Sequence, residues 1–132
     1  MKWLILLIED ESHDAEAFHR AVGGQHDVIE AGSLARADEL LQLHDPDAII
    51  ADIGLPDGDF ETVLTWLLSR HEHTPCIVYS GSGQYVERCR ELGLRSLRKL
   101  TGDRGDEINR VLMEAAREVM KRVRARLAVA SA

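Results

Sequence analysis

The feature that most constrains this chain is a strict alternation of short apolar runs with longer stretches of helical apolar spacing. Short apolar runs bounded by turn residues are typical of buried strands, and apolar residues three and four apart are typical of one helix face. Because crossovers between parallel strands are right-handed, this alternation predicts a parallel sheet with helices on both faces, a doubly wound α/β fold. The expected strands are 3–8, 26–31, 47–51, 75–80 and 93–98, and the expected helices are 12–22, 34–43, 59–70, 84–92 and about 106–127.

The stretch DAIIADIGLPDGD, residues 47–59, shows how one of these runs ends. Pro56 and Gly58 would break a helix almost at once, so a strand explains the apolar run before them better. Asp52 then lies at the C-terminal tip of that strand. In open α/β sheets, this edge is where ligands bind.

Local signals mark several element ends. Arg95 and Arg98 alternate with leucines in the last run, which suits a half-exposed strand at the edge of the sheet. Ser33 is expected to cap the helix that follows it, and Glu11 to help start the first helix. Gly93 is a natural C-terminal stop for the fourth helix.

Length and composition limit the class of protein. With 132 residues the chain can form one domain with a hydrophobic core, which we expect to fill residues 1–132. The longest apolar stretch, 3–8, is too short to span a bilayer and no signal-peptide pattern follows it, which predicts a cytoplasmic protein without membrane contact. The net charge of −7 argues against direct nucleic-acid binding. Cys76 and Cys89 have no metal-ligand spacing and are expected to be reduced, at least half-buried thiols.

Carboxylates follow two of the predicted strands. Glu9, Asp10 and Glu11 come directly after the first, where many such sheets place a phosphate-binding glycine loop, and Asp52 ends the third. If these strands are neighbours, Glu9, Asp10 and Asp52 converge, and carboxylates that close resist joint ionisation unless a cation lies among them. Oxygen ligands that leave coordination positions to water suit Mg²⁺. The acids therefore predict a site for a divalent cation.

Two further strand ends add a hydroxyl and an ammonium group. Ser80 ends the fourth strand, and Lys99 follows the fifth. A carboxylate nucleophile beside Mg²⁺, with a hydroxyl and a lysine directed at the same point, matches the needs of phosphoryl transfer. The metal and the lysine would neutralise charge on the phosphoryl oxygens while Asp52 attacks in line.

Taken together, four motifs resemble those of the receiver domain of two-component response regulators. LLIEDES resembles the family's acidic pair after strand one, and DIGLPDGDF its phospho-acceptor aspartate with a downstream proline and glycine. IVYSGSG resembles the Ser or Thr that ends strand four, and LRK the lysine after strand five. The resemblance covers residues 2 to about 115 and implies a flavodoxin-like sheet with strand order 2-1-3-4-5.

Carried over to this chain, the resemblance implies a phosphorylation site. Asp52 would accept a phosphoryl group from a histidine kinase or a histidine phosphotransfer protein. Asp10, Asp52 and the backbone carbonyl of Gly54 would hold Mg²⁺, and Glu9 would act on the metal through water.

The resemblance also implies a switch. Ser80 and Lys99 would bind the phosphoryl group once it forms, and the added charge would bias a two-state surface. The protein would catalyse only its own phosphorylation and dephosphorylation rather than act as an enzyme on other substrates. As a stand-alone receiver, it would signal through contact with a downstream protein.

The fifth strand departs from the family pattern. Ser96 and Leu97 stand where the family usually has an aromatic residue, and Leu100 follows Lys99 where the family commonly has a proline. We expect a modified signalling surface with the phosphorylation chemistry intact.

Other interpretations are weighed against this one. The altered fifth strand is compatible with a receiver-like adaptor whose binding ignores phosphorylation. An aspartyl phosphatase resembling the haloacid dehalogenase group is disfavoured, because such enzymes need a second Asp where this chain has Gly54. His71 and His73 lack a third ligand at suitable spacing, so a solvated helix end is predicted there rather than a metal site.

The last predicted helix, about 106–127, is the longest and is basic. An apolar stripe through Val123 and Leu127 continues past the point where such domains usually end. A solvated face with cations suited to a helix C-terminus is one explanation, and a partner contact or a homodimer is the other. The cations are Arg117, Lys121, Arg122, Arg124 and Arg126.

Overall fold

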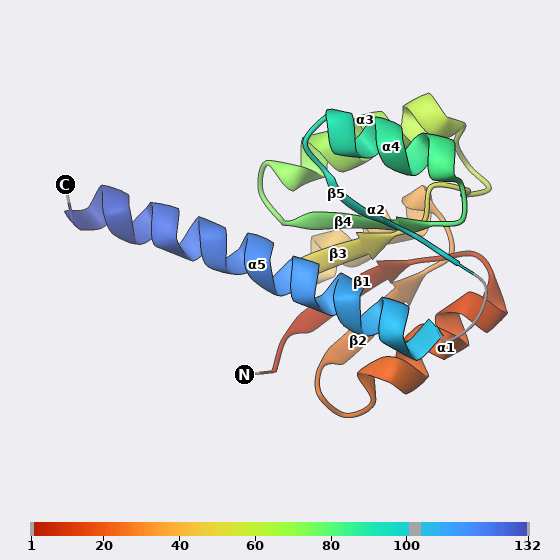
Figure 1. Cartoon of the computed structure of the whole chain (residues 1–132), viewed down its shortest axis with the longest axis horizontal. Helices are drawn as coiled ribbons and strands as arrows, with labels where there is room; N and C mark the ends of the chain where they lie inside the picture. The colour runs from red at the N-terminus through yellow and green to blue at the C-terminus, as the bar shows by residue number, and fades with distance from the viewer. Residues whose placement is uncertain (1, 101–103, 132) are drawn as a thin grey trace.

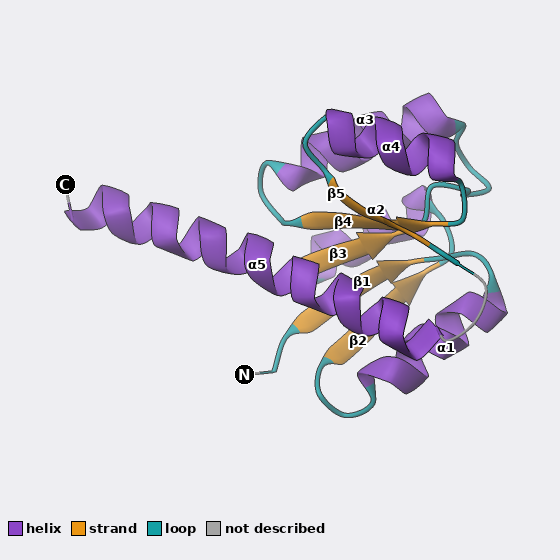
Figure 2. Cartoon of the chain, in the orientation of Figure 1, coloured by secondary structure: helices purple, strands orange, loops and turns teal. Residues whose placement is uncertain are grey.

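Five parallel strands and five helices alternate along the described part of the chain, as the sequence predicts. A computed structural model describes residues 2–100 and 104–131. The strand order is β2-β1-β3-β4-β5, which confirms the doubly wound, flavodoxin-like sheet (Figures 1 and 2). The strands are β1 Leu4–Ile8, β2 Asp27–Ala31, β3 Ala48–Ala51, β4 Cys76–Ser80 and β5 Arg95–Arg98; the helices are α1 Ser12–Val22, α2 Leu34–Leu43, α3 Phe60–His71, α4 Gly83–Glu91 and α5 Arg104–Ser131. Most bounds lie within two residues of those predicted, but α5 runs four residues beyond position 127.

The central strands send successive side chains to opposite faces of the sheet, and each face has its own core. On β1, Leu6 and Ile8 pack under α2 and α3, whereas Ile5 and Leu7 pack under α1 and α5. Burial on both faces explains why β1, β3 and β4 are almost continuously apolar. Phe18 of α1 is among the large side chains that are fully buried in the second core.

The edge strand and the helix ends follow the sequence signals. β5 lies at one edge of the sheet, where its Arg98 is exposed. Ser33 Oγ accepts the backbone N–H of Arg36 at 3.1 Å, and Glu11 accepts that of His13. Gly93 has a φ of +93°, a left-handed conformation that favours glycine, and it ends α4 as predicted.

Cys76 and Cys89 are both buried and form no disulfide, which confirms the prediction of reduced thiols. Burial raises the pKa of the Cys76 thiol to about 12, so this thiol stays protonated and unreactive. No helix in the described part of the chain is long and apolar enough to cross a membrane.

His71 is the last residue of α3, but its side chain is not solvated, so the prediction of a solvated helix end is wrong for this residue. Its Nδ1 accepts the backbone N–H of Cys76 at 3.0 Å, and its side chain is only 21% exposed. The ring therefore satisfies a donor at the start of β4 that would otherwise be buried unpaired. Its partner in the sequence motif, His73, is exposed.

Asp57 makes a connection that the sequence does not reveal. It lies in the loop after β3, yet its two carboxylate oxygens accept the backbone N–H groups of Leu34 and Ala35, each at 2.9 Å. These are free donors of the first turn of α2, so the loop after Asp52 is tied to a neighbouring helix.

Replacing Asp57 with Ala is expected to lower the free energy of unfolding by about 1 kcal/mol, because two helix donors lose their acceptor. Those donors lower the pKa of Asp57, so its ionised form favours the folded state. The stabilisation is present above the unfolded pKa of about 3.9 and disappears as the pH falls through the lower folded-state pKa. Urea unfolding at neutral pH and at about pH 3 measures both effects. Glu16→Ala, at an exposed position of α1, is the control, and an equal loss in that variant would contradict the assignment.

Candidate functional site

The site lies at the carboxyl edge of the sheet, where the order of strands reverses between β1 and β3. β1 pairs with both β2 and β3, and two backbone hydrogen bonds extend the ladders past the strand ends. The N–H of Glu9 donates to Ala31 and that of Asp52 donates to Ile8, each at 2.9 Å. The two acidic residues are therefore held by the sheet itself rather than by a free loop.

Three carboxylates converge there as the sequence predicts. One oxygen from each of Glu9, Asp10 and Asp52 lies within 4.8 Å of the others. Glu9 is buried, Asp52 is half-buried and Asp10 is exposed, so the cluster opens to solvent on one side. All the donors are carboxylate oxygens, the ligands preferred by hard divalent cations such as Mg²⁺. The residues present fit such an ion.

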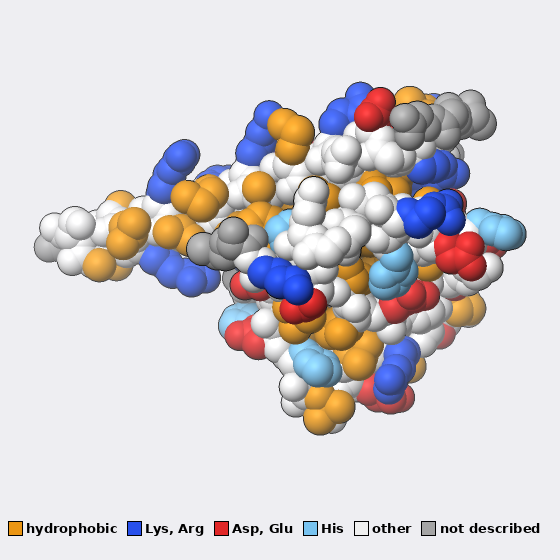
Figure 3. All heavy atoms as spheres, turned by 90° about the horizontal axis from the view of Figure 1, so that it is seen from below, with side chains coloured by type: hydrophobic (Ala, Val, Ile, Leu, Met, Phe, Trp, Pro, Cys, Tyr) orange, Lys and Arg blue, Asp and Glu red, His pale blue; other side chains and the backbone are white. Residues whose placement is uncertain are grey.

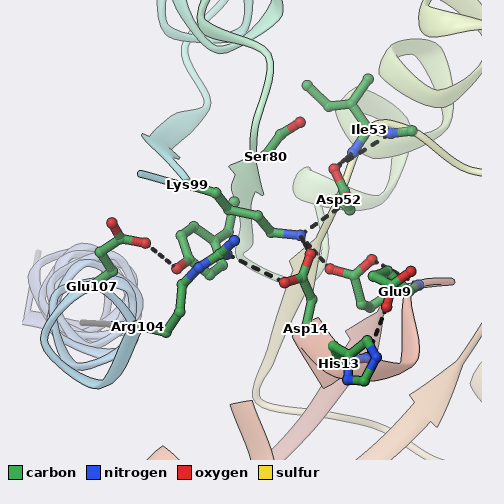
Figure 4. Close-up of polar contacts among 12 residues, drawn as sticks. Glu9, His13, Asp14, Asp52, Ile53, Ser80, Lys99, Arg104 and Glu107 are labelled. Carbon is green, nitrogen blue, oxygen red and sulfur yellow. Dashed lines mark hydrogen bonds and ion pairs between the residues drawn. The ribbon is translucent and has the colours of Figure 1, made fainter. Parts of the chain in front are cut away.

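Lys99 lies at the centre of this cluster (Figure 4). Its backbone N–H donates to the Ser80 carbonyl at 2.8 Å, which fixes the end of β5 beside the end of β4. Its side chain is 5% exposed, and Nζ contacts Glu9, Asp14 at 3.0 Å and Asp52 at 3.1 Å. One buried ammonium group therefore joins carboxylates from three segments of the chain.

The charge of Lys99 keeps Asp52 ionised. Burial acts to raise the pKa of Asp52, but the nearby ammonium group and hydrogen bonds from Ser80, Lys99 and Ile53 outweigh it, so the pKa is lowered. Ile53 contributes a backbone N–H at 2.7 Å. Burial likewise acts to lower the pKa of Lys99, and the charges of Asp52 and Glu9 outweigh it and raise that pKa. Asp52 is thus held as an ionised carboxylate in a half-buried position.

Glu9 behaves in the opposite way. Burial raises its pKa to about 7, and the negative charge of Asp52 adds to this, although Lys99 partly offsets both. The pKa of Glu9 is raised while that of neighbouring Asp52 is lowered, which indicates that Lys99 alone does not supply enough positive charge for both carboxylates near neutral pH.

The remaining predicted residues surround Asp52. Ser80 is buried at the end of β4, and its Oγ accepts the backbone N–H of Ser82 at 3.5 Å. Gly54 follows Asp52 by two residues and its N–H donates to Asp52 Oδ1 at 3.4 Å. Ser80 is the last residue of β4, and Gly54 lies in the loop after β3.

Sequence reasoning missed Asp14, the third partner of Lys99. It lies on the first turn of α1, four residues after Asp10, and also approaches Arg104 at 3.4 Å. The signal that could have indicated Asp14 is its position four residues after Asp10, in the first turn of a helix that begins beside the site.

Sequence reasoning also missed a group of contacts next to the altered fifth strand, centred on Glu107. The Tyr79 hydroxyl donates to Glu107 at 2.5 Å, and the backbone N–H of Leu100 donates to the same carboxylate at 2.9 Å. Proline at position 100 would have no N–H to give, so the departure from Lys-Pro creates this contact. Burial, together with Glu107, raises the pKa of Tyr79 to about 12, so the hydroxyl remains a donor. The Tyr79 ring also lies 5.4 Å from Lys99 Nζ.

The comparison with known protein families decides the class of this protein. The family model described as the response regulator receiver domain matches residues 5–104. The chain belongs to this family. It is therefore a receiver domain of the two-component signalling type, in agreement with the four sequence motifs.

Several solved structures share the fold of this receiver. The signal receiver domain of a protein described as a Luxo repressor, from Vibrio parahaemolyticus, is 22% identical with a TM-score of 0.74, over 97% of this chain and 98% of its own. NtrX from Brucella abortus is 20% identical with a TM-score of 0.82, over 96% of this chain and 30% of its own. The Mn²⁺-bound form of response regulator Rcp1 is 23% identical with a TM-score of 0.67, over 83% of this chain and 88% of its own. No curated protein matches the chain significantly.

Replacing Lys99 with Met is expected to lower the free energy of unfolding at neutral pH by about 3 kcal/mol, because buried carboxylates lose the cation between them. Urea unfolding measures the loss, and millimolar Mg²⁺ is expected to recover part of it by supplying charge to the same acids. The control is Lys2→Met, which removes a lysine whose side chain is 57% exposed. Equal stabilities of the two variants would refute the central role of Lys99.

The raised pKa of Glu9 predicts a pH dependence. Between the unfolded pKa of about 4.3 and the folded value of about 7, the folded state binds a proton that the unfolded state has lost. This contribution to stability is complete below the lower value and is lost as the pH rises to the higher one. Glu9→Gln is expected to flatten the fall of unfolding free energy across that window, as measured by urea unfolding at a series of pH values. The assignment would be contradicted if unfolding free energy fell with pH as steeply in Glu9→Gln as in wild type. It would also be contradicted if the control Glu16→Gln flattened that fall.

Proposed function

We propose that this receiver is a phosphorylation switch in which Asp52 accepts a phosphoryl group in a Mg²⁺-dependent reaction. The observation that carries the proposal is the half-buried, ionised Asp52 with Lys99 Nζ at 3.1 Å and two further carboxylates within ligand distance of one cation. Asp10, Asp52 and the Gly54 carbonyl would hold the ion, and Glu9 would reach it through water. Rcp1, which shares this fold, has a Mn²⁺-bound form, in keeping with a divalent metal in this receiver.

The chemistry follows from the groups around Asp52. A carboxylate oxygen of Asp52 attacks the phosphorus of a phosphohistidine; the new O–P bond forms as the N–P bond breaks, and the histidine nitrogen leaves with its electron pair. Bound Mg²⁺ would supply positive charge to the phosphoryl oxygens. Lys99 is already aimed at the acceptor oxygen, so it neutralises charge on the transferred group without a large movement.

The phosphorylated state would be transmitted through the loop after β4. When the Ser80 hydroxyl turns to a phosphoryl oxygen, its contact with the N–H of Ser82 is lost. Ser82 caps α4 by accepting the N–H of Tyr85, and the Tyr85 ring stacks on Phe60 of α3 at 4.1 Å. A change at Ser80 is therefore coupled to the start of α4 and to an aromatic contact between two helices.

The partners follow from this chemistry. The phosphoryl donor is a histidine kinase or a histidine phosphotransfer protein in the cytoplasm, and the output is a contact with a downstream protein. The receiver acts on no other substrate: it catalyses its own phosphorylation, and water at the same site removes the group.

Intact mass after incubation with acetyl phosphate, with and without Mg²⁺, tests the proposal. Wild type is expected to gain one phosphoryl group only when Mg²⁺ is present, and Asp52→Asn is expected to gain none. Asp10→Asn is expected to need at least about tenfold more Mg²⁺, because one ligand is lost.

The matched control is Asp57→Asn, which changes a nearby acid outside the cluster and is expected to be phosphorylated normally. Phosphorylation of Asp52→Asn would reassign the acceptor. No mass gain in folded wild type with bound Mg²⁺ would instead favour an adaptor that does not depend on phosphorylation.

A further inference from the structure

The outer half of α5 extends away from the sheet (Figure 1). The inner half buries residues such as Ile108 and Val111 against the sheet, and Arg122 then donates to the backbone carbonyl of His71. Every residue from Val123 to Ser131 is exposed. This part of the helix is therefore ordered outside the core that explains the rest of α5.

A second apolar face runs along α5, separate from the face that packs on the sheet. Its members recur at alternating steps of three and four residues, and its large side chains are exposed: Met113 by 54%, Met120 by 47%, Val123 by 36% and Leu127 by 61%. A sustained seven-residue repeat of this kind is the pattern of a helix that pairs lengthwise with another helix. We name this face the α5 seam; it consists of Met113, Ala116, Met120, Val123, Leu127 and Ala130.

Positive charge borders the α5 seam on both sides. With Met113, Met120 and Leu127 as the a positions of the repeat, Arg117 and Arg124 occupy e positions and Arg126 a g position. Residues 119–132 carry four positive charges and no negative one, so the rest of the chain, with −7 overall, carries −11. Figure 3 shows hydrophobic and basic side chains, without acidic ones, on the visible face of the outer helix.

From the repeat and its flanking charges, we propose that the α5 seam is a docking surface for an acidic amphipathic helix of another protein. The apolar side chains of that helix would pack between Met120, Val123 and Leu127. Its flanking Glu or Asp residues would face Arg124 and Arg126, which lie in a segment, residues 119–132, that carries no acid; Arg117 already pairs with Glu114. The e and g positions of paired helices set partner choice, so the partner should be acidic at those positions.

A second copy of this chain fits the α5 seam poorly. In a parallel homodimer the same three arginines, Arg117, Arg124 and Arg126, would border the seam on both helices, and residues 119–132 carry no acid to pair with them. The positive charge beside the α5 seam thus favours an acidic partner helix and disfavours a second copy of this chain.

A membrane surface also fits poorly. Helices that lie on membranes present a wide apolar face with Trp, Phe or Leu. The α5 helix contains no aromatic residue, two of the six seam positions are alanine, and arginines border the narrow stripe on each side.

Binding of a synthetic helix to the full chain tests the proposal. The probe is a fluorescein-labelled peptide of three heptads with Leu at a and d and Glu at e and g, and the reference peptide has Gln in place of each Glu. In fluorescence anisotropy, the Glu peptide is expected to bind at least about tenfold more tightly than the Gln peptide. This difference is expected to shrink as salt is raised from about 50 to 300 mM, because exposed ion pairs are screened.

Paired variants separate the seam from the rest of the helix. Met120→Glu and Leu127→Glu are each expected to weaken binding at least about tenfold. Val129→Glu makes the same change on the other side of the helix, at a side chain that is 78% exposed, and is expected to bind as wild type does. Arg124→Gln is expected to weaken binding of the Glu peptide, whereas Lys121→Gln, at a position outside e and g, is not. Circular dichroism checks that each variant keeps its helix.

Four results would overturn the proposal. The first is equal affinity for the Glu and Gln peptides, and the second is no binding of either up to about 100 µM. The third is a dimer of the chain alone in light scattering that Met120→Glu abolishes, which would assign the seam to a second copy. The fourth is seam-dependent binding to anionic phosphatidylserine vesicles without binding of the Glu peptide, which would assign it to a membrane surface.

Discussion

The ammonium group of Lys99 lies among carboxylates that come from the end of β1, from α1 and from the end of β3. Because the backbone of Lys99 is itself bonded to Ser80, this residue links the ends of four strands in one electrostatic unit. The ionised state of Asp52 depends on it, and so does the balance among the other acids. Any cation that enters the cluster shares these oxygens with Lys99, so metal binding and the position of the lysine are coupled.

The contacts of Tyr79 and Glu107 explain how the structure accommodates the departures from the family pattern at the fifth strand. Without an aromatic residue on β5, the buried ring beside the site comes from Tyr79 of β4. Glu107 of α5 accepts hydrogen bonds from Tyr79 and from Leu100, so the site side of β4, the segment after β5 and the start of α5 form one connected group. Leu100, which stands where the family commonly has proline, thereby links the residue after Lys99 to α5.

The sheet and much of the site could be predicted because they depend on local patterns. Burial on both faces leaves continuous apolar runs, and parallel strands bring residues such as Asp10, Asp52 and Lys99 to one edge. What escaped prediction depends on distances between segments remote in sequence. The pairing of Asp57 with α2, the acceptor role of His71 and the contact of Asp14 with Lys99 all require the packed structure, since each side chain alone looks like an ordinary surface residue.

The attachment of α5 has a mechanical consequence. Its middle is fixed to β5 by Arg95, which donates to Glu114 and Glu118, and to the end of α3 by Arg122, which donates to the carbonyl of His71. Beyond Arg122 the helix runs on for about 14 Å at 1.5 Å per residue. A tilt of about 10° around this fixed point therefore displaces the tip by about 2 Å. A movement of β5 that tilts α5 would therefore be larger at the far end of the helix than at its attachment.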